Sequence, residues 1–390
     1  MTDELNDDER WFAHLLASVP TPASLSGAGA TAAPTARRHQ RRFAGRVGVL
    51  MPLLLAVAVI SAGVGLTLPR LHGGRQVAPV TAGAPPPRSE AALAGDDVHQ
   101  LVVLFGGRGG DGTLLDDTWL WDGGHWSQQH PAHSPSARRA AAMSSDPDDG
   151  GLLLLGGLGS DGLPAGDSWT WNGSDWQPLS ATGAPPPRSG AAMAWDPIAG
   201  SLVLHGGPGA TADPAGTTWI RRERAWLSHH DDIAPSVCTS PMAFDDATRA
   251  LVLVTGHGCG AGAGLTWSWD GHVWAQEHPA ASPPAADRAA LAYDQSSQQL
   301  VLFLPPPDSG GPCGQTWTWD GAGWMLRGAS LPASAAAAVA DPASRRPLLL
   351  TVTGETWSWD GATWQPLQGA ATRVASGAAN QPNPCAGAHR

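Results

Sequence analysis

The stretch SWTWNGSDW at residues 168–176 decides the fold. Trp169 and Trp171 are two positions apart, so in a strand their side chains point to the same face. Asn172-Gly173 is a dipeptide that tight hairpin turns favour, because both residues tolerate positive φ angles. Trp176 then opens a second strand. The stretch therefore predicts a β-hairpin built around tryptophans.

The same pattern occurs six times along the chain. The first tryptophans of the copies are Trp119, Trp169, Trp219, Trp267, Trp317 and Trp357, with spacings of 50, 50, 48, 50 and 40 residues. An alanine-rich segment ending at an aspartate, and then a short apolar run, precede each copy; the aspartates are Asp96, Asp146, Asp196, Asp245, Asp294 and Asp341. Each unit thus predicts four short strands. Six such units predict an all-β, six-bladed β-propeller over residues 83–367.

Tryptophan dominates the aromatic composition, with 19 tryptophans against five phenylalanines and one tyrosine. Tryptophan fills every position of the repeated pattern except one in the third unit, where Arg221 stands. Because an indole ring buries a large apolar area, we expect the repeated tryptophans to fill the space between neighbouring blades. Stacking on sugar rings is the alternative role.

Three segments carry a family resemblance. Pro185–Met193 begins with Pro-x-Arg and continues as an apolar strand, Leu202–Gly207 is an apolar strand ending in Gly-Gly, and Asp167–Trp176 holds Asp-x-Trp-x-Trp with a closing tryptophan. This order resembles the kelch repeat, as found in the propeller of galactose oxidase-like proteins. The resemblance covers residues 83–367. It implies a kelch-like propeller, although kelch repeats usually carry tyrosine at the second tryptophan position.

Catalysis of the galactose oxidase type, as this resemblance implies, uses copper held by two tyrosines and two histidines. The single tyrosine, Tyr293, cannot fill two positions. It aligns with Trp195 and Phe244 in the first strand of their units, so we expect it to be a packing residue. The histidines near the loops, His205, His229, His230 and His257, have no fixed metal-ligand spacing. We therefore expect neither a cofactor nor a metal.

A membrane anchor is predicted near the N-terminus. From Val47 to Leu68 the chain runs for 22 residues without a charge, which as a helix is about 33 Å long and matches the hydrocarbon core of a bilayer. Five arginines precede it and two follow closely: Arg37, Arg38, Arg41, Arg42, Arg46, then Arg70 and Arg75. This bias predicts a cytoplasmic N-terminus and an extracytoplasmic propeller in a single-pass protein of the cell membrane. A cleaved signal peptide is the alternative, but its apolar stretch is usually roughly 7–15 residues.

The expected segments are a largely disordered cytoplasmic tail at 1–46, the transmembrane helix at 47–68, a linker at 69–82, the propeller at 83–367 and a flexible C-terminal tail at 368–390. Within the first tail, Trp11, Phe12, Leu15 and Leu16 follow an acidic cluster at helical spacing. This short helix is either simply solvated or a docking segment for a cytoplasmic partner. The second layout is shared with membrane-anchored regulators such as anti-sigma factors.

The loops of the repeat are unequal in length. In a four-stranded antiparallel blade, the loops after the second and fourth strands leave on one face, here called the long-loop face, and the tight turns leave on the other, here called the turn face. Segments such as 106–117 and 156–167 are long, so we expect the ligand to bind on the long-loop face.

Arginines recur at one position of that face in the first three units. The corresponding residues of the six units are Arg88, Arg138, Arg188, Val237, Ala286 and Ala333. The three arginines are either a clamp that binds a carboxylate, a phosphate or an acidic sugar, or ties to loop carbonyls of adjacent blades.

The chain contains four cysteines, which can form disulfides if the protein resides in an oxidising compartment. Cys238 and Cys259 fall in the same unit and on the same face, so a Cys238–Cys259 disulfide is the preferred pairing in an oxidising compartment, with Cys313 and Cys385 as the remainder. Sequence alone leaves the connectivity open.

Composition narrows the function. The net charge of -11 opposes nucleic-acid binding, and the chain has no lysine for Schiff-base catalysis. We expect a membrane-anchored extracytoplasmic propeller that binds a glycan or a protein, more a binding module than an enzyme. Two alternatives stay open: an extracellular carbohydrate-active enzyme, and a transmembrane signalling protein whose N-terminal tail binds a regulator.

Overall fold

The structure, a computed structural model, describes residues 81–180, 183–207, 216–231, 233–235, 240–256, 264–285, 288–306, 313–329 and 335–367. Within these ranges there is no helix long and apolar enough to cross a membrane. The expected anchor at 47–68, the tail at 1–46 and the tail at 368–390 lie outside them, so those three assignments stay predictions.

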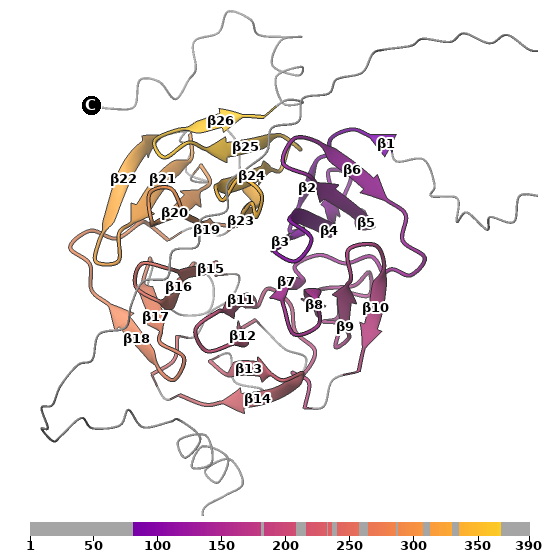
Figure 1. Ribbon diagram of the computed structural model, residues 1–390, viewed down its shortest axis with the longest axis horizontal. Coiled ribbons are helices and arrows are strands. Elements are labelled where there is room, and N and C mark those ends of the chain that lie inside the picture. Colours follow the sequence, from indigo (N-terminus) through magenta and orange to yellow (C-terminus); the bar gives the residue numbers. More distant parts are fainter. Residues whose placement is uncertain are drawn as a thin grey trace, which may run out of the picture. The chain divides into compact units, whose positions relative to one another are not determined.

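Six four-stranded antiparallel blades form a ring (Figure 1). Blade 1 contains β3 (Ala92–Asp96), β4 (Leu101–Gly109), β5 (Leu114–Trp121) and β6 (Trp126–Gln129), and blade 2 contains β7 (Ala142–Asp146), β8 (Gly151–Leu155), β9 (Ser168–Trp171) and β10 (Trp176–Leu179). Blade 3 contains β11 (Ala192–Asp196), β12 (Ser201–His205), β13 (Thr218–Arg222) and β14 (Ala225–His229), and blade 4 contains β15 (Met242–Asp245), β16 (Ala250–Val254), β17 (Thr266–Trp269) and β18 (Trp274–Glu277). Blade 5 contains β19 (Ala290–Asp294), β20 (Gln299–Leu304), β21 (Gln315–Trp319) and β22 (Trp324–Ala329), and blade 6 contains β23 (Ala335–Ala340), β24 (Pro347–Thr351), β25 (Thr356–Trp359) and β26 (Trp364–Pro366). The all-β, six-bladed propeller predicted from the repeat is confirmed.

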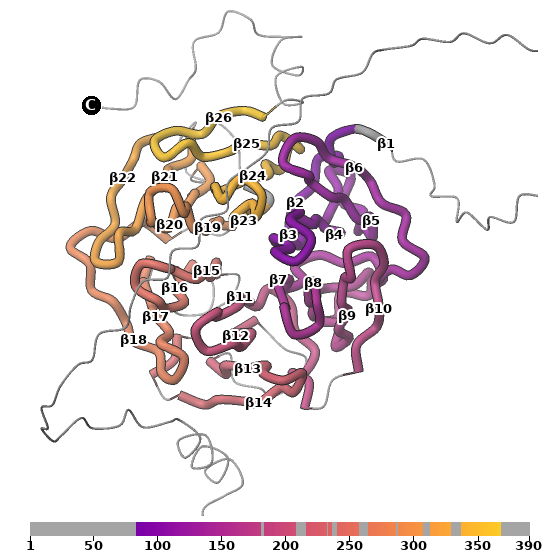
Figure 2. Tube along the Cα trace, viewed as in Figure 1, coloured from indigo at the N-terminus to yellow at the C-terminus, as the bar shows by residue number. Residues whose placement is uncertain are grey.

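The blades follow one another round the ring in chain order, as Figure 2 shows, and each takes its four strands from one stretch of chain. Two short strands add to blade 1: β1 (Thr81–Ala82) pairs with the outer strand β6, and β2 (Arg88–Ser89) pairs with the end of β4. The first and last blades meet without exchanging a strand. Their seam includes a hydrogen bond from the Arg88 N–H to the Val352 carbonyl at 3.0 Å.

In blades 1, 2, 4, 5 and 6 the second and third tryptophans of the repeat form the packing between blades, as predicted, whereas blade 3 has Arg221 in place of the second. Trp171 and Trp176 are fully buried, and their rings lie 5.3 Å apart in a tilted arrangement. The equivalent pairs in blades 1, 4, 5 and 6 have centroid distances of 5.3 to 5.5 Å. First tryptophans such as Trp169 are only partly buried. Most of the unusual tryptophan content therefore stabilises the ring.

A hydrogen bond that sequence reasoning missed links successive blades. The indole N–H of Trp176 in blade 2 donates to the hydroxyl of Thr118 in blade 1 at 3.0 Å. The same bond recurs from Trp274 to Thr218, Trp324 to Thr266, Trp364 to Thr316 and, across the seam, Trp126 to Thr356. The repeated Thr-Trp pair thus has a cause: the threonine satisfies a buried donor of the next blade.

Candidate functional site

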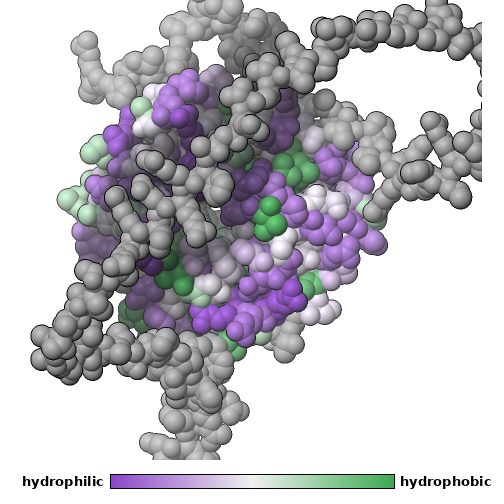
Figure 3. Space-filling view, viewed as in Figure 1, coloured by the Kyte–Doolittle hydropathy of each residue, from purple (hydrophilic) through white to green (hydrophobic). Residues whose placement is uncertain are grey.

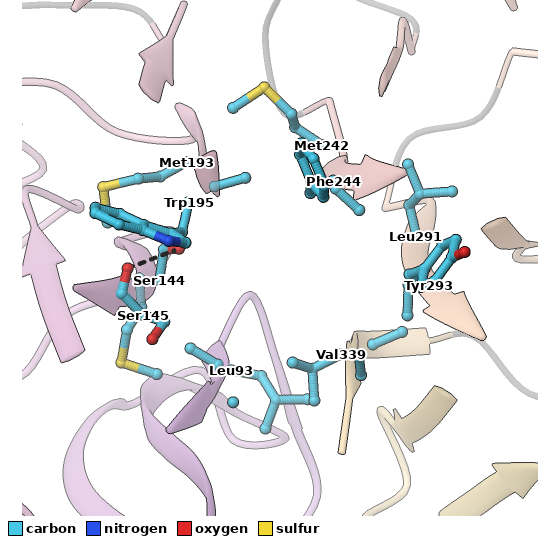
Figure 4. A pocket seen from close by; sticks show the side chains of 18 of the residues that line it. Leu93, Ser144, Ser145, Met193, Trp195, Met242, Phe244, Leu291, Tyr293 and Val339 are labelled. Carbon is cyan, nitrogen blue, oxygen red and sulfur yellow. Dashed lines mark hydrogen bonds between the residues drawn. The ribbon is translucent and has the colours of Figure 1, made fainter. Parts of the chain in front are cut away.

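A channel runs through the centre of the ring, lined by the inner strand of every blade (Figure 4). Its cavity measures about 240 Å³. The side chains that surround it include Leu93, Met193, Phe244, Leu291 and Val339. A second cavity of about 210 Å³ is lined by the beginnings of the same strands, on the side of the long-loop face, and alanines dominate it. The channel is therefore narrow, and its side chains are mostly apolar, with Ser144 and Ser145 among them.

Small residues make this narrow channel possible, because six inner strands converge on one axis. Gly95 of β3 shows the constraint: a Cβ atom there would lie 2.9 Å from the carbonyl oxygen of Ala340 in β23. Ala92, Ala142 and Ala192 occupy one repeat position near the strand starts and are all buried. The alanine-rich segments of the sequence are thus the strands that line the axis.

A polar cavity of about 190 Å³ lies at the mouth of the channel on the turn face, and we call it the channel mouth. Its lining comes from turns of blades 1, 4, 5 and 6 and from the end of β23, and consists of Asp97, Gln100, Asp246, Tyr293, Gln295, Ala340, Asp341, Pro342 and Arg345. Tyr293, Ala340 and Asp97 also line the channel, so the two cavities adjoin. Charged and amide side chains from four blades therefore meet at the end of an apolar channel.

The turns that carry these residues share a local construction. The aspartate that ends each inner strand is buried; Asp341, for example, accepts hydrogen bonds from the Ala343 N–H at 3.1 Å and the Ser344 hydroxyl at 2.7 Å. A residue of the turn is left-handed, with φ of 57° both at Gln100, directly before β4, and at Arg345, two residues before β24. This conformation costs a non-glycine residue of order 1 kcal/mol. The turns thus hold their outer side chains at fixed positions on the rim.

Hydrogen bonds hold part of the channel mouth in place. The guanidinium of Arg345 donates to the Gln295 side chain at 2.8 Å, and the side chain of Gln100 donates to the backbone carbonyl of Asp97 at 2.8 Å. Asp97 has a raised pKa, because the surrounding protein removes water from it and the charge of Asp96 lies nearby. Asp97 therefore favours its protonated form more than an ordinary surface aspartate does.

Tyr293 borders both cavities but is not placed as a nucleophile. Burial, together with the charges of Asp246, Asp245 and Asp294, raises its pKa to about 12. Its ring packs against the core cluster that contains Leu291, and in Figure 4 its hydroxyl points away from the centre of the channel. The geometry agrees with the packing role expected from its alignment.

The three arginines of the predicted clamp are buried, and their side chains form bonds within their own blades. Arg88 donates to the Gly106 carbonyl at 3.0 Å and, through both terminal nitrogens, to Asp117 at 2.7 and 2.8 Å. Arg138 repeats these contacts with Gly156 and Asp167.

Arg188 occupies the same position in blade 3 with a different set of contacts. It donates to the Gly206 carbonyl at 3.0 Å, and its guanidinium lies 5.6 Å from the ring centroid of Trp219. The arginines therefore bond loop carbonyls, as one of the two alternatives held, but in their own blade instead of an adjacent one. A ligand-binding role for them stays a prediction.

The backbone of the same arginines reaches the preceding blade. The Arg138 N–H donates to the Leu115 carbonyl at 3.1 Å, and its own carbonyl accepts from the Gly107 N–H at 2.9 Å. Gly107 has a φ of +103°, and a Cβ atom there would lie 2.8 Å from the Ser89 carbonyl oxygen. Each arginine thus joins two blades, which explains why Pro-x-Arg and Gly-Gly occur together in the repeat.

The long-loop face is described only in part. Segments 208–215, 257–263 and 307–312, which follow the second strands of blades 3, 4 and 5, lie outside the described residues. In blade 1 the corresponding segment is a hairpin, because β4 extends to Gly109 and β5 begins at Leu114. Binding on the long-loop face therefore stays a prediction, whereas the channel mouth lies on the opposite face.

Cys238, Cys259 and Cys385 also lie outside the described residues, so the predicted Cys238–Cys259 pairing stays a prediction. Cys313 is buried and disulfide-bonded.

No group of three or more His, Cys, Asp or Glu side chains within the described ranges is arranged to hold a metal ion. His205 is fully buried, with its two ring nitrogens 2.8 Å from the Thr218 hydroxyl and 2.7 Å from the Pro235 carbonyl. Burial lowers its pKa to about 4. His205 is therefore a neutral hydrogen-bonding residue of the core at physiological pH.

The visible surface offers no large apolar patch that would compete with the channel mouth as a site. On the face seen in Figure 3 the described surface is mostly hydrophilic, with separate apolar spots. The exposed large apolar residues are spread over several blades: Val98, Leu163, Ile198, Ile233, Val273, Met325 and Leu326. Single exposed apolar residues of this kind are normal on a protein surface.

These features define a six-bladed β-propeller of contiguous four-stranded blades with a polar cavity at one mouth of its channel. Among solved structures, the chain is similar to one described as "Structure of YjhT", with a TM-score of 0.54 and 14% sequence identity. The match covers 73% of this chain and 98% of the other. At this identity the likeness shows the fold alone. No protein-family model and no curated protein matches the sequence.

Proposed function

We propose that this protein is a binding module: a kelch-like propeller that takes part of a glycan or of a protein into its channel mouth. The observation that carries the proposal is the lining of this cavity. Carboxylate, amide and guanidinium groups from four blades converge there beside the ring of Tyr293. Planar hydrogen-bonding groups next to an aromatic side chain suit both sugar hydroxyls and polar side chains.

The size of the cavity sets what it can take. Pockets for drug-sized ligands have volumes of roughly 300–1,000 Å³. The channel mouth, at about 190 Å³, is smaller. It suits one sugar ring or one side chain of a larger ligand that otherwise stays outside.

The proposal places the propeller outside the cytoplasm, held by a membrane anchor at residues 47–68. The disulfide at Cys313 supports an oxidising compartment, since disulfides persist in exported proteins and are rare in the cytosol. Protease treatment of intact cells tests this placement. Digestion of the propeller with an intact N-terminal tail is expected, and protection of the propeller would overturn the topology.

Binding is tested with the full-length protein in detergent on a glycan array and on a library of surface-protein fragments. Gln295→Ala removes one amide from the channel mouth, and Gln177→Ala, on the outer strand β10, serves as the matched control. Any glycan or protein that binds should lose affinity about three- to tenfold in the first variant and keep it in the second, as expected for one hydrogen bond. Equal loss in both variants, or no ligand at all, would refute the proposal.

An enzyme acting on carbohydrate is the second candidate, and the raised pKa of Asp97 is the observation that favours it. General acids of glycoside hydrolases are carboxylic acids whose pKa is raised by their surroundings. Release of reducing ends from glycans that bind on the array tests this candidate. Turnover that disappears in Asp97→Asn would replace binding by catalysis as the function.

A further inference from the structure

The charges at the channel mouth are unequal. Its lining contains the carboxylates of Asp97, Asp246 and Asp341 and the guanidinium of Arg345. Asp341 is buried, and its two oxygens are held by its own turn. Asp97 and Asp246 are exposed on the rim. The groups that an incoming ligand meets therefore carry net negative charge.

Asp97 and Asp246 belong to blades 1 and 4, which lie opposite each other in the six-membered ring (Figure 1). No hydrogen bond or ion pair from another described residue reaches the carboxylate of Asp246. The positive group of the lining, Arg345, has one terminal nitrogen bonded to Gln295. The carboxylate of Asp246 is thus available to a ligand, which need not displace a partner from the described part of the chain.

Below the rim the chemistry changes from polar to apolar. Most side chains that line the channel are apolar, such as Leu93 and Val339, with Ser144 and Ser145 among them, and Asp97 is the charged residue of its lining. An ion cannot leave water for such a passage without a large loss of hydration. A charged ligand group therefore stays at the rim, while the carbon skeleton that bears it faces the apolar entrance.

We infer that the ligand group taken by the channel mouth is an aliphatic ammonium, either the free amine of an amino sugar or the side chain of a lysine. Each offers three N–H donors, which suit the carboxylate of Asp246 and the side-chain oxygen of Gln295, two acceptors in the lining of this cavity. An anionic group would instead meet two carboxylates at the rim. The net charge of -11 also favours the approach of a cation.

This inference deepens the proposed function and rests on it. The probes are matched pairs: an oligomer of glucosamine and its N-acetylated form, and a lysine peptide and its Nε-acetylated form. Titration of the full-length protein should show at least tenfold tighter binding of the amine in one of the two pairs. The pair that discriminates identifies the source as a glycan or a protein.

Three variants locate the effect. Asp246→Asn should weaken binding of the amine about tenfold, as loss of one charge-assisted hydrogen bond does. Arg345→Gln removes the competing cation and should tighten it about threefold. Asp116→Asn makes the same charge change at an exposed residue of the long-loop face and should leave the affinity unchanged.

The outcomes separate this inference from the proposed function. Equal binding of amine and acetylated probes, equal loss in Asp246→Asn and Asp116→Asn, or no binding of any amine probe would overturn the ammonium inference. Neutral glycans or acetylated peptides that bind and lose affinity in Gln295→Ala would still support a binding module. Loss of binding by neutral and charged ligands alike would defeat both.

Discussion

Blades 2 and 3 are copies of one repeat that lie fifty residues apart in the sequence. One side chain of blade 3 makes the contact between these two blades different from the contacts between other neighbouring blades. Trp171 of blade 2 is fully buried against Trp176. At the equivalent position blade 3 has Arg221, equally buried, whose guanidinium pairs with Asp146 and, at 2.6 Å, with Asp149 of blade 2. A charged pair thus replaces an indole ring between these two blades.

The charged pair leaves two of its own polar atoms unsatisfied: among the described residues, Arg221 Nε and one oxygen of Asp146 are buried without a hydrogen-bond partner. The indole N–H of Trp171, at the equivalent position of blade 2, is likewise buried without one. Burial raises the pKa of Asp146 even though Arg221 lies beside it. The comparison shows that the repeat accepts a buried charge at this position where the preceding blade supplies carboxylates to pair with it.

Removal of the Asp146 carboxylate should have the largest effect on the contact between blades 2 and 3. Asp146→Ala leaves Arg221 buried with Asp149 as its remaining partner, and should lower the free energy of unfolding by about 3–4 kcal/mol. The double variant Asp146→Ala/Arg221→Trp, which removes both charges and restores the repeat tryptophan, should recover most of that loss. Chemical denaturation followed by tryptophan fluorescence measures both. An equally severe loss in the double variant would mean that the ion pair itself holds the two blades together.

Blade 3 also makes the stability of the folded protein depend on pH, because it has His205 where blade 2 has Leu155 and blade 1 has Phe105. The pKa of His205 is about 4 in the folded protein, against about 6.5 in an unfolded chain. The unfolded state binds the proton more tightly, so stability is lost as the pH falls from 7 to 4, by about 3 kcal/mol. His205→Phe should remove this component of the acid sensitivity. Identical pH profiles for wild type and variant would contradict the assignment.

Arg138, of blade 2, tests the side-chain contacts that the recurring arginine makes within its own blade, because its backbone bonds to blade 1 survive the substitution. Arg138→Ala strands the Gly156 carbonyl and Asp167, whose side chain is 44% exposed and can therefore regain water. The expected loss is about 2 kcal/mol. Arg139→Ala, the matched control, breaks a half-exposed pair with Glu90 and should cost less than about 1 kcal/mol. Similar losses in the two variants would argue against a structural role specific to Arg138.

The smallest effect concerns Trp226 of blade 3. Its indole N–H is buried without a hydrogen-bond partner among the described residues, whereas the equivalent indole N–H of the other blades donates to a threonine hydroxyl. Blade 2 has Ser168 at that position. The branched side chain of threonine restricts the hydroxyl rotamer, so Ser168→Thr should supply the missing bond and stabilise the protein by about 0.5–1 kcal/mol. A rise in the midpoint of chemical denaturation checks this. No change would mean that geometry, and not the choice of residue, keeps Trp226 unbonded.

Much of the fold could be predicted because its signals are local. Strand β9 begins and ends at the residues that the repeat indicated, since alternating tryptophans and an Asn-Gly turn define a hairpin within ten residues. The segment 106–117 was expected to be a loop but is largely a hairpin. Its glycines and aspartates favour turns, and the pairing of Arg108 with Leu114 is a contact that composition does not reveal.

The candidate site was much less predictable. The residues of the channel mouth belong to four turns spread from Asp97 to Arg345. Two of these turns begin with Asp-Asp, yet nothing local shows that Asp97 and Asp246 line one cavity. Arg88, Arg138 and Arg188 drew attention because they recur, yet their side chains form bonds within the ring itself. Recurrence in a repeat protein marks what every blade needs, so it does not by itself identify a ligand site.

The sequence by itself determined the strands, the turns, the number of blades and the packing role of the tryptophans, because each depends on periodicity and turn chemistry within about fifty residues. Only the tertiary structure decided which turns meet across the axis, that Arg221 faces Asp146, and where the polar cavity opens. Those neighbours are set by the closure of the ring, which brings together residues as far apart in the chain as Arg88 and Val352 and leaves no local pattern in the sequence.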